Sequence, residues 1–208
     1  MATLDTPTER TIGRPARRAP EGPVGRSTGW WGMVLFICTE SATFAAFLAS
    51  YFYLRYDTHG PWPPPADKLP GLFWPSLSTG ILVLSCIPMA IAVRTAKRDA
   101  RVLTWLNLLL VFLSGSLFCA LTGLDFVIEW PDSTVSKDAY GSLFYTIPGL
   151  HAVHVLVGIV MAGMLLLSVP LGRVKRHPQS VALVAVYWYF LGVLAVAVYA
   201  TVYISPYL

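Results

Sequence analysis

A few ionisable side chains stand inside long apolar stretches of this sequence. Glu40 lies ten residues into the first stretch, and Phe36, Phe44 and Phe47 share its helical face. If that stretch crosses a bilayer, a charged carboxylate near its middle costs about 2.5–3.5 kcal/mol, so it must be sheltered or protonated. Two interpretations stay open: a role in proton handling or lipid contact, and a structural hydrogen bond to a neighbouring helix.

Two histidines, His151 and His154, are three residues apart and therefore lie on one face of a helix. Such a pair could ligate a metal, but a closed metal site needs about four ligands. The other histidines, His59 and His177, fall in connections between the apolar stretches. We therefore expect no metal centre and no catalytic residue on this chain, and we favour hydrogen bonds from the pair to Glu40 or Asp125.

Asp125 stands near the end of the third apolar stretch, with Glu129 one helical turn further on. The position allows an acid solvated at the membrane interface. It also allows an acid used inside the protein, such as a proton relay with Glu40. Both interpretations stay open.

Small residues also have informative positions. Two series have a spacing of four residues that lets helices approach closely: Gly115, Cys119 and Gly123, and Gly158 and Ala162. The three cysteines lie in apolar runs without paired spacing, so we expect small core residues: Cys38, Cys86 and Cys119.

The elements that must position these side chains follow from the composition. Of the 208 residues, 55% are hydrophobic and 12% charged, whereas soluble domains carry about 25% charged residues. Five apolar runs are each long enough to cross a bilayer as a helix, at about 30–54, 73–93, 102–128, 143–171 and 181–204. They are apolar on every face, unlike barrel strands. We predict an all-α, five-helix integral membrane bundle.

Charge placement predicts the orientation. Three basic residues lie on one predicted side of the membrane: Arg55, Lys68 and Lys137. The other 12 of the 15 Lys and Arg residues lie on the opposite side, in the first 26 residues and in the connections at 94–101 and 173–176. The positive-inside rule therefore puts the N-terminus in the cytoplasm and the C-terminus outside. The net charge of +4 is a topology signal, and we expect no nucleic-acid partner.

The chain divides into two predicted parts. Residues 1–28 are rich in Pro, Arg, Thr and Gly, which predicts a mobile cytoplasmic tail, with a transit peptide as the alternative. Residues 29–208 form the membrane domain. The proline-rich segment 59–71 is expected to be an external loop, with Trp62 and Trp74 at the interface.

The first apolar stretch resembles the opening of subunit III of the haem–copper oxidases. That family carries the pattern G-M-x-L-F-I-x-S-E-x-x-x-F. The matching residues are Gly32, Met33, Leu35, Phe36, Ile37, Glu40 and Phe44, with Thr39 in the serine's place.

Further motifs extend the resemblance to about residues 29–208. The family's F-Y-x-x-T-G-x-H-x-x-H-V-x-x-G is matched at Gly149, His151, His154, Val155 and Gly158, with Pro148 for threonine. Thr122 and Asp125 stand where the family has Q-x-x-E, and the run at 62–65 is also typical. The last stretch departs from the family's H-F-V-D-x-x-W, with Tyr189, Gly192 and Ala195 at the histidine, aspartate and tryptophan.

The resemblance implies a non-catalytic accessory subunit of a proton-pumping terminal oxidase, in the short five-helix form of a bacterial plasma membrane. It implies packing against the catalytic subunit I and other subunits, which would carry the haem and copper. It also implies bound phospholipid and support of proton uptake. Glu40 would be the buried carboxyl group of the lipid cleft, and His151, His154 and Arg55 structural polar residues.

Two alternatives stay open beside this one. The divergent last stretch is compatible with the corresponding subunit of a nitric oxide reductase or another haem–copper assembly. A small proton or ion transporter using Glu40 and Asp125 is the alternative from a different class. Repeated, Gly/Pro-broken helices typical of secondary transporters are missing from the sequence.

Overall fold

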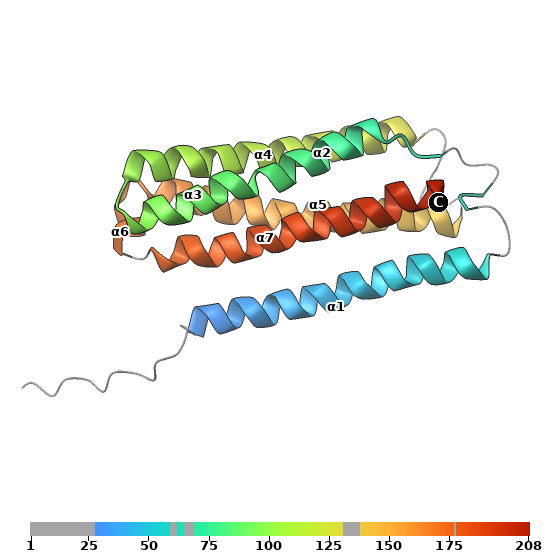
Figure 1. Ribbon diagram of the computed structural model, residues 1–208, viewed down its shortest axis with the longest axis horizontal. Coiled ribbons are helices and arrows are strands. Elements are labelled where there is room, and N and C mark those ends of the chain that lie inside the picture. The colour runs from blue at the N-terminus through green and yellow to red at the C-terminus, as the bar shows by residue number, and fades with distance from the viewer. Residues whose placement is uncertain (1–27, 59–61, 65–68, 131–137, 177) are drawn as a thin grey trace, which may run out of the picture.

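A computed structural model describes residues 28–58, 62–64, 69–130, 138–176 and 178–208. These residues form a helical bundle whose long helices run side by side (Figure 1). The elements are α1 (Thr28–Asp57), α2 (Phe73–Leu84), α3 (Cys86–Lys97), α4 (Arg101–Glu129), α5 (Ala139–Ser168), α6 (Arg173–Arg176) and α7 (Gln179–Tyr199). A π-helical turn (Ala200–Ile204) and a 3-10 turn (Ser205–Tyr207) complete the last span.

Five spans in the described residues are long and apolar enough to cross a membrane, with α2 and α3 together forming the second. The all-α, five-span prediction is confirmed, and the chain is a multi-pass membrane protein. The predicted mobile tail of residues 1–28 lies almost wholly outside the described residues, as do His59 and His177, and the tail stays a prediction.

The second span differs from the single helix that its apolar run predicts. It is interrupted at Ser85, which lies between α2 and α3. Pro88 lies in the first turn of α3 and has no N–H to donate to the carbonyl group four residues earlier. At this interruption the Ser85 Oγ accepts a hydrogen bond from Trp188 Nε1 of α7 at 2.8 Å.

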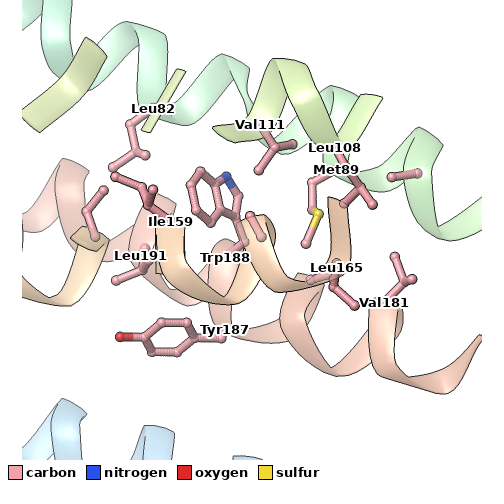
Figure 2. Packing of buried hydrophobic residues seen from close by; sticks show 14 of the residues in the cluster. Leu82, Met89, Leu108, Val111, Ile159, Leu165, Val181, Tyr187, Trp188 and Leu191 are labelled. Atoms are coloured by element: carbon pink, nitrogen blue, oxygen red, sulfur yellow. The ribbon is translucent and has the colours of Figure 1, made fainter. Parts of the chain in front are cut away.

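The core of the bundle is built around Trp188. Figure 2 shows its indole among Val111 of α4, Ile159 of α5 and Leu191 of α7. Two glycines make room for the ring: a Cβ on Gly115 would lie 2.7 Å from Trp188, and one on Gly158 would lie 3.1 Å from it. The predicted close approach is thus confirmed at these positions, whereas Gly123 has no neighbour within 4 Å of a Cβ.

Helix α1 lies at the edge of the bundle and contacts α5 and α7 (Figure 1). Only 6% of the residues in its most apolar 18-residue segment are buried, against 50% in the corresponding segment of the last span. Phe44 and Tyr51 are its buried residues. The expectation that all three cysteines are core residues is wrong for Cys38, because its side chain on α1 is exposed.

Candidate functional site

The polar contact that joins α1 to α5 is a pair formed by Glu40 and His154. Glu40 Oε2 lies 2.7 Å from His154 Nε2, and both side chains are largely buried. The predicted hydrogen bond between the histidine pair and Glu40 is therefore found at His154. The contact spans 114 residues of sequence, so it links helices that are far apart along the chain.

The partners of His154 determine where protons must lie. Its Nδ1 is 2.8 Å from the backbone carbonyl oxygen of Leu150, one turn earlier on α5. A carbonyl oxygen only accepts, so Nδ1 carries a hydrogen and donates it. A second proton must then lie between Nε2 and the Glu40 carboxyl group, because two acceptors do not attract each other. The pair is neutral as a whole, either as acid and imidazole or as carboxylate and imidazolium.

Aromatic rings enclose this pair. The ring of Phe44 on α1 lies 5.2 Å from that of His154 and 6.4 Å from that of His151, edge to face in both cases. Tyr187 on α7 donates its hydroxyl to the His154 carbonyl oxygen at 3.1 Å. The Tyr187 ring also lies 5.7 Å from Phe36. The shared aromatic face predicted for α1 thus packs against α5, which holds both histidines, and against α7.

His151 has a different partner from the one expected. Its Nε2 donates to the backbone carbonyl oxygen of Leu191 on α7 at 3.2 Å, and its ring lies 5.3 Å from Phe118. The residue is 2% exposed. The two histidines therefore bind different neighbours, because residues three apart on a helix diverge by about 60°.

Asp125 is buried, with 1% of its surface exposed. In this fold it is therefore not an acid solvated at the membrane interface. Its Oδ2 accepts a hydrogen bond from the Tyr203 hydroxyl at 2.7 Å. Asp125 and His151 line one small cavity together with Thr122 and Tyr199. The cavity volume is about 20 Å³, which is room for about one water molecule.

Arg55 fastens the other end of α1 to the C-terminal turns. Its Nη1 donates to the Ser205 carbonyl oxygen at 2.8 Å. The Ser205 hydroxyl in turn donates to the Tyr51 hydroxyl at 3.2 Å. Arg55, expected to be a structural polar residue, therefore binds a backbone group of the last span.

Sequence reasoning missed the partners supplied by the end of the chain. Tyr203 and Ser205 lie in the π-helical and 3-10 turns after α7, where helical periodicity no longer predicts which way a side chain points. Ser85 was also missed as the acceptor for Trp188. The nearby Pro88 was the available signal for an interrupted helix.

The assembled site can bind and hold a proton. Within the described part of the chain, no group of three His, Cys, Asp or Glu side chains is placed to hold a metal ion. The Glu40–His154 pair offers two ligands, and each is already engaged by the other. The chemistry that the geometry supports is therefore proton exchange at the Oε2–Nε2 hydrogen bond, together with helix fastening.

Comparison with known proteins identifies the family. The family model for cytochrome c oxidase subunit III matches residues 24–207. The chain belongs to the cytochrome c oxidase subunit III family. A probable cytochrome c oxidase subunit 3 of Nocardia farcinica is 27% identical over 83% of this chain and 85% of its own length. The subunit 3 of Drosophila yakuba is 31% identical over 83% of this chain and 68% of its own length.

The structure explains one departure of this subunit III homologue from the family pattern. Gly192 stands where the pattern has aspartate, and a Cβ there would lie 2.9 Å from the Cys86 sulfur atom. The α3 and α7 backbones therefore come closer at this point than a larger residue allows. At this position α7 packs closely against α3.

Proposed function

We propose that this chain is a non-catalytic accessory subunit of a proton-pumping haem–copper terminal oxidase in aerobic respiration. The observation that carries the proposal is the family match over residues 24–207, which includes all five spans. In that role the bundle packs against the catalytic subunit I and other subunits of the complex. Those partner subunits carry the haem and copper at which oxygen is reduced.

The proposed location is a bacterial plasma membrane, with the N-terminus in the cytoplasm and the C-terminus outside. Its support is the basic end of the bundle. Arg94 and Lys97 end α3, Arg98 and Arg101 follow at the turn into α4, and Arg173 begins α6. These elements meet at the same end in Figure 1. The positive-inside rule assigns that end to the cytoplasm.

The proposed role of the Glu40–His154 pair is to hold one proton at the interface of α1 and α5 and to support proton uptake by the complex. Because the pair is neutral with that proton, it is tolerated within the membrane at much lower cost than an isolated carboxylate. Phospholipid bound beside the exposed side of α1 belongs to the same proposal. Asp125 is the second acidic candidate for proton handling. It accepts a hydrogen bond from Tyr203 and is separate from the Glu40–His154 pair.

The test isolates the chain from its native membrane in mild detergent and identifies what migrates with it. We expect a haem-bearing subunit I and oxygen consumption. If the isolated complex reduces nitric oxide instead of oxygen, the result would support the alternative haem–copper assembly. Proton flux carried by the chain alone in liposomes would support the transporter alternative.

Substitution of Glu40 tests the role of the pair. In Glu40→Gln the amide group still donates a hydrogen bond to His154 Nε2, so assembly stays intact while proton exchange at that bond is lost. We expect a modest reduction in proton uptake and faster inactivation during turnover. Loss of co-purification in Glu40→Gln would show that Glu40 is purely structural.

A further inference from the structure

The small cavity beside Asp125 lies between four helices, each of which contributes to its lining. Thr79 comes from α2, Thr122 and Asp125 come from α4, His151 comes from α5, and Ala195 comes from α7. The cavity volume is about 20 Å³. Asp125 and His151 are both almost completely buried, so this cavity is the space onto which their side chains open.

Several polar atoms of the lining have hydrogen bonds still to make. Asp125 accepts from Tyr203 at Oδ2, and its Oδ1 has no partner among the described residues. His151 donates from Nε2 to a backbone carbonyl oxygen of α7, so Nδ1 is the acceptor nitrogen of a neutral imidazole. The hydroxyls of Thr79 and Thr122 also have no partner in the described part of the chain. A buried polar group left in this state costs free energy.

One water molecule fits both the size of the cavity and the groups that line it. A buried water needs about 10–15 Å³ and typically makes about three hydrogen bonds to polar groups that lack other partners. The cavity exceeds that volume and offers donors and acceptors from two helices. Asp125 stands one helical turn before Glu129, the last residue of α4. That turn is about 6 Å along the helix, so the cavity lies close to the interface from which water enters.

The cavity depends on the small side chain of Ala195. This residue lines the cavity and is buried. The family pattern has tryptophan at this position, and a larger side chain at a residue that lines so small a space would fill it. The cavity is therefore a feature of this chain and does not follow from the family pattern.

We infer that the cavity binds one internal water molecule, which donates a hydrogen bond to His151 Nδ1 and is held by Asp125 Oδ1 and the Thr122 hydroxyl. The water joins α4 to α5 within the membrane. It also gives each histidine of α5 a carboxyl partner on another helix: His154 contacts Glu40 directly, and His151 reaches Asp125 through the water. The inference concerns the occupant of the cavity and does not require the proposed oxidase role.

The bridging water lets Asp125 and His151 share one proton. In one form the carboxyl group is protonated and donates to the water, which donates to His151 Nδ1. In the other form the carboxyl proton has passed to the water, and one of the water's own protons has passed to Nδ1. That transfer leaves a carboxylate, an intact water molecule and an imidazolium. Both forms are neutral as a whole, and no Lys or Arg is among the described residues that line the cavity to favour an unprotonated unit.

The experiment is solid-state NMR of the full chain in lipid bilayers with ¹⁵N-labelled histidine, in which magnetisation passes from water protons to the imidazole nitrogens. His151→Gln identifies the His151 signals by their loss. We expect a water contact at His151 Nδ1 in the natural chain. The Nδ1 chemical shift should lie between those of a neutral imidazole and an imidazolium, because the proton is shared.

Two variants remove the site in different ways. Ala195→Leu fills the cavity and is expected to abolish the water contact. Its matched control is Ala185→Leu, because Ala185 is equally buried on α7 and does not line the cavity. Thr122→Val keeps the side-chain size but removes a hydroxyl that holds the water, so the contact should weaken. Its control is Thr104→Val, at a buried position of α4 outside the cavity, and it should leave the contact unchanged.

Asp125→Asn tests the shared proton separately from the water. The amide group still binds the water but has no acidic proton, so the water contact should remain while the His151 Nδ1 shift moves to that of a neutral imidazole. An Nδ1 shift that is the same in this variant and in the natural chain would refute proton sharing.

The inference would be overturned if the natural chain showed no water contact at His151. A water contact that persists unchanged in Ala195→Leu would also overturn it, because the water would then lie outside this cavity. A proton bonded to Nδ1 without any water contact would show a direct hydrogen bond to Asp125 instead. None of these results depends on whether the isolated complex reduces oxygen, so the proposed function is tested separately.

Discussion

Helices α1 and α7 are both apolar enough to span a membrane, but they are held in different ways. Helix α7 is the more buried of the two, and its residues Trp188, Leu191 and Ala195 are all buried. Helix α1 is held by a few separate contacts, of which the chief are Glu40 to His154, Phe44 against both histidines, and Arg55 to Ser205. Its remaining surface is mostly exposed.

The difference shows which force fixes each helix. In a bilayer, lipid tails are as apolar as leucine, so association depends on close packing and on hydrogen bonds rather than on hydrophobicity. Helix α7 uses close packing, because Gly115 and Gly158 let Trp188 approach neighbouring backbones. Helix α1 depends on hydrogen bonds and ring contacts. We therefore expect substitutions in α7 to destabilise the whole bundle and substitutions in α1 to release that helix alone.

The largest effect is expected for Trp188→Ala, because it empties the space at the centre of the core and leaves the Ser85 hydroxyl without its donor. We expect a loss of about 3–5 kcal/mol in the free energy of unfolding. Reversible unfolding of the full chain in mixed micelles measures it. Trp130→Ala, at an exposed position, is the control. Equal losses in the two variants would contradict packing as the force that holds α7.

Gly192→Asp places the family's aspartate in this particular bundle. The new Cβ would lie 2.9 Å from the Cys86 sulfur atom, and a carboxylate near mid-membrane costs about 2.5–3.5 kcal/mol. We expect a loss of about that size in the same unfolding measurement. Combining it with Cys86→Ala removes the steric part and restores some stability. A variant as stable as the natural chain would mean that α7 shifts freely against α3.

Tyr203→Phe tests the buried acid that the C-terminal turn covers. Asp125 loses the hydrogen bond that the Tyr203 hydroxyl donates, and an unsatisfied buried polar group costs about 1–3 kcal/mol. The free energy of unfolding should fall by that amount, while α1 stays attached. Tyr56→Phe, at an exposed position, should change nothing. An unchanged stability in Tyr203→Phe would indicate that Asp125 has another donor in the membrane.

The smallest effect is expected at the Glu40–His154 pair. A double-mutant cycle with Glu40→Leu and His154→Leu should give a coupling free energy of about 0.6 kcal/mol, with an upper value near 1.7 kcal/mol. A spin label on Cys38, which is naturally exposed on α1, should report increased mobility of that helix in each variant. A coupling near zero would leave the aromatic contacts and the Arg55–Ser205 hydrogen bond to hold α1.

Much of the candidate site follows from residue types along the chain. Glu40 and His154 are predicted partners because both are polar groups on otherwise apolar helices, and such groups seek each other in a membrane. Their distance of 2.7 Å confirms the contact. His151 was harder to place, because a backbone carbonyl such as that of Leu191 is present at every position and leaves no sequence signal.

The sequence by itself determined the five spans, because a run of about 20 apolar residues between charged connections has one stable place, across a bilayer. It also indicated which ionisable side chains lie within the spans, because such groups are conspicuous in apolar runs. Only the tertiary structure decided that Asp125 is buried under Tyr203, that Trp188 rather than a polar group centres the bundle, and that α1 lies at its edge. These depend on which helices become neighbours, and uniformly apolar helix surfaces do not encode that choice through periodicity.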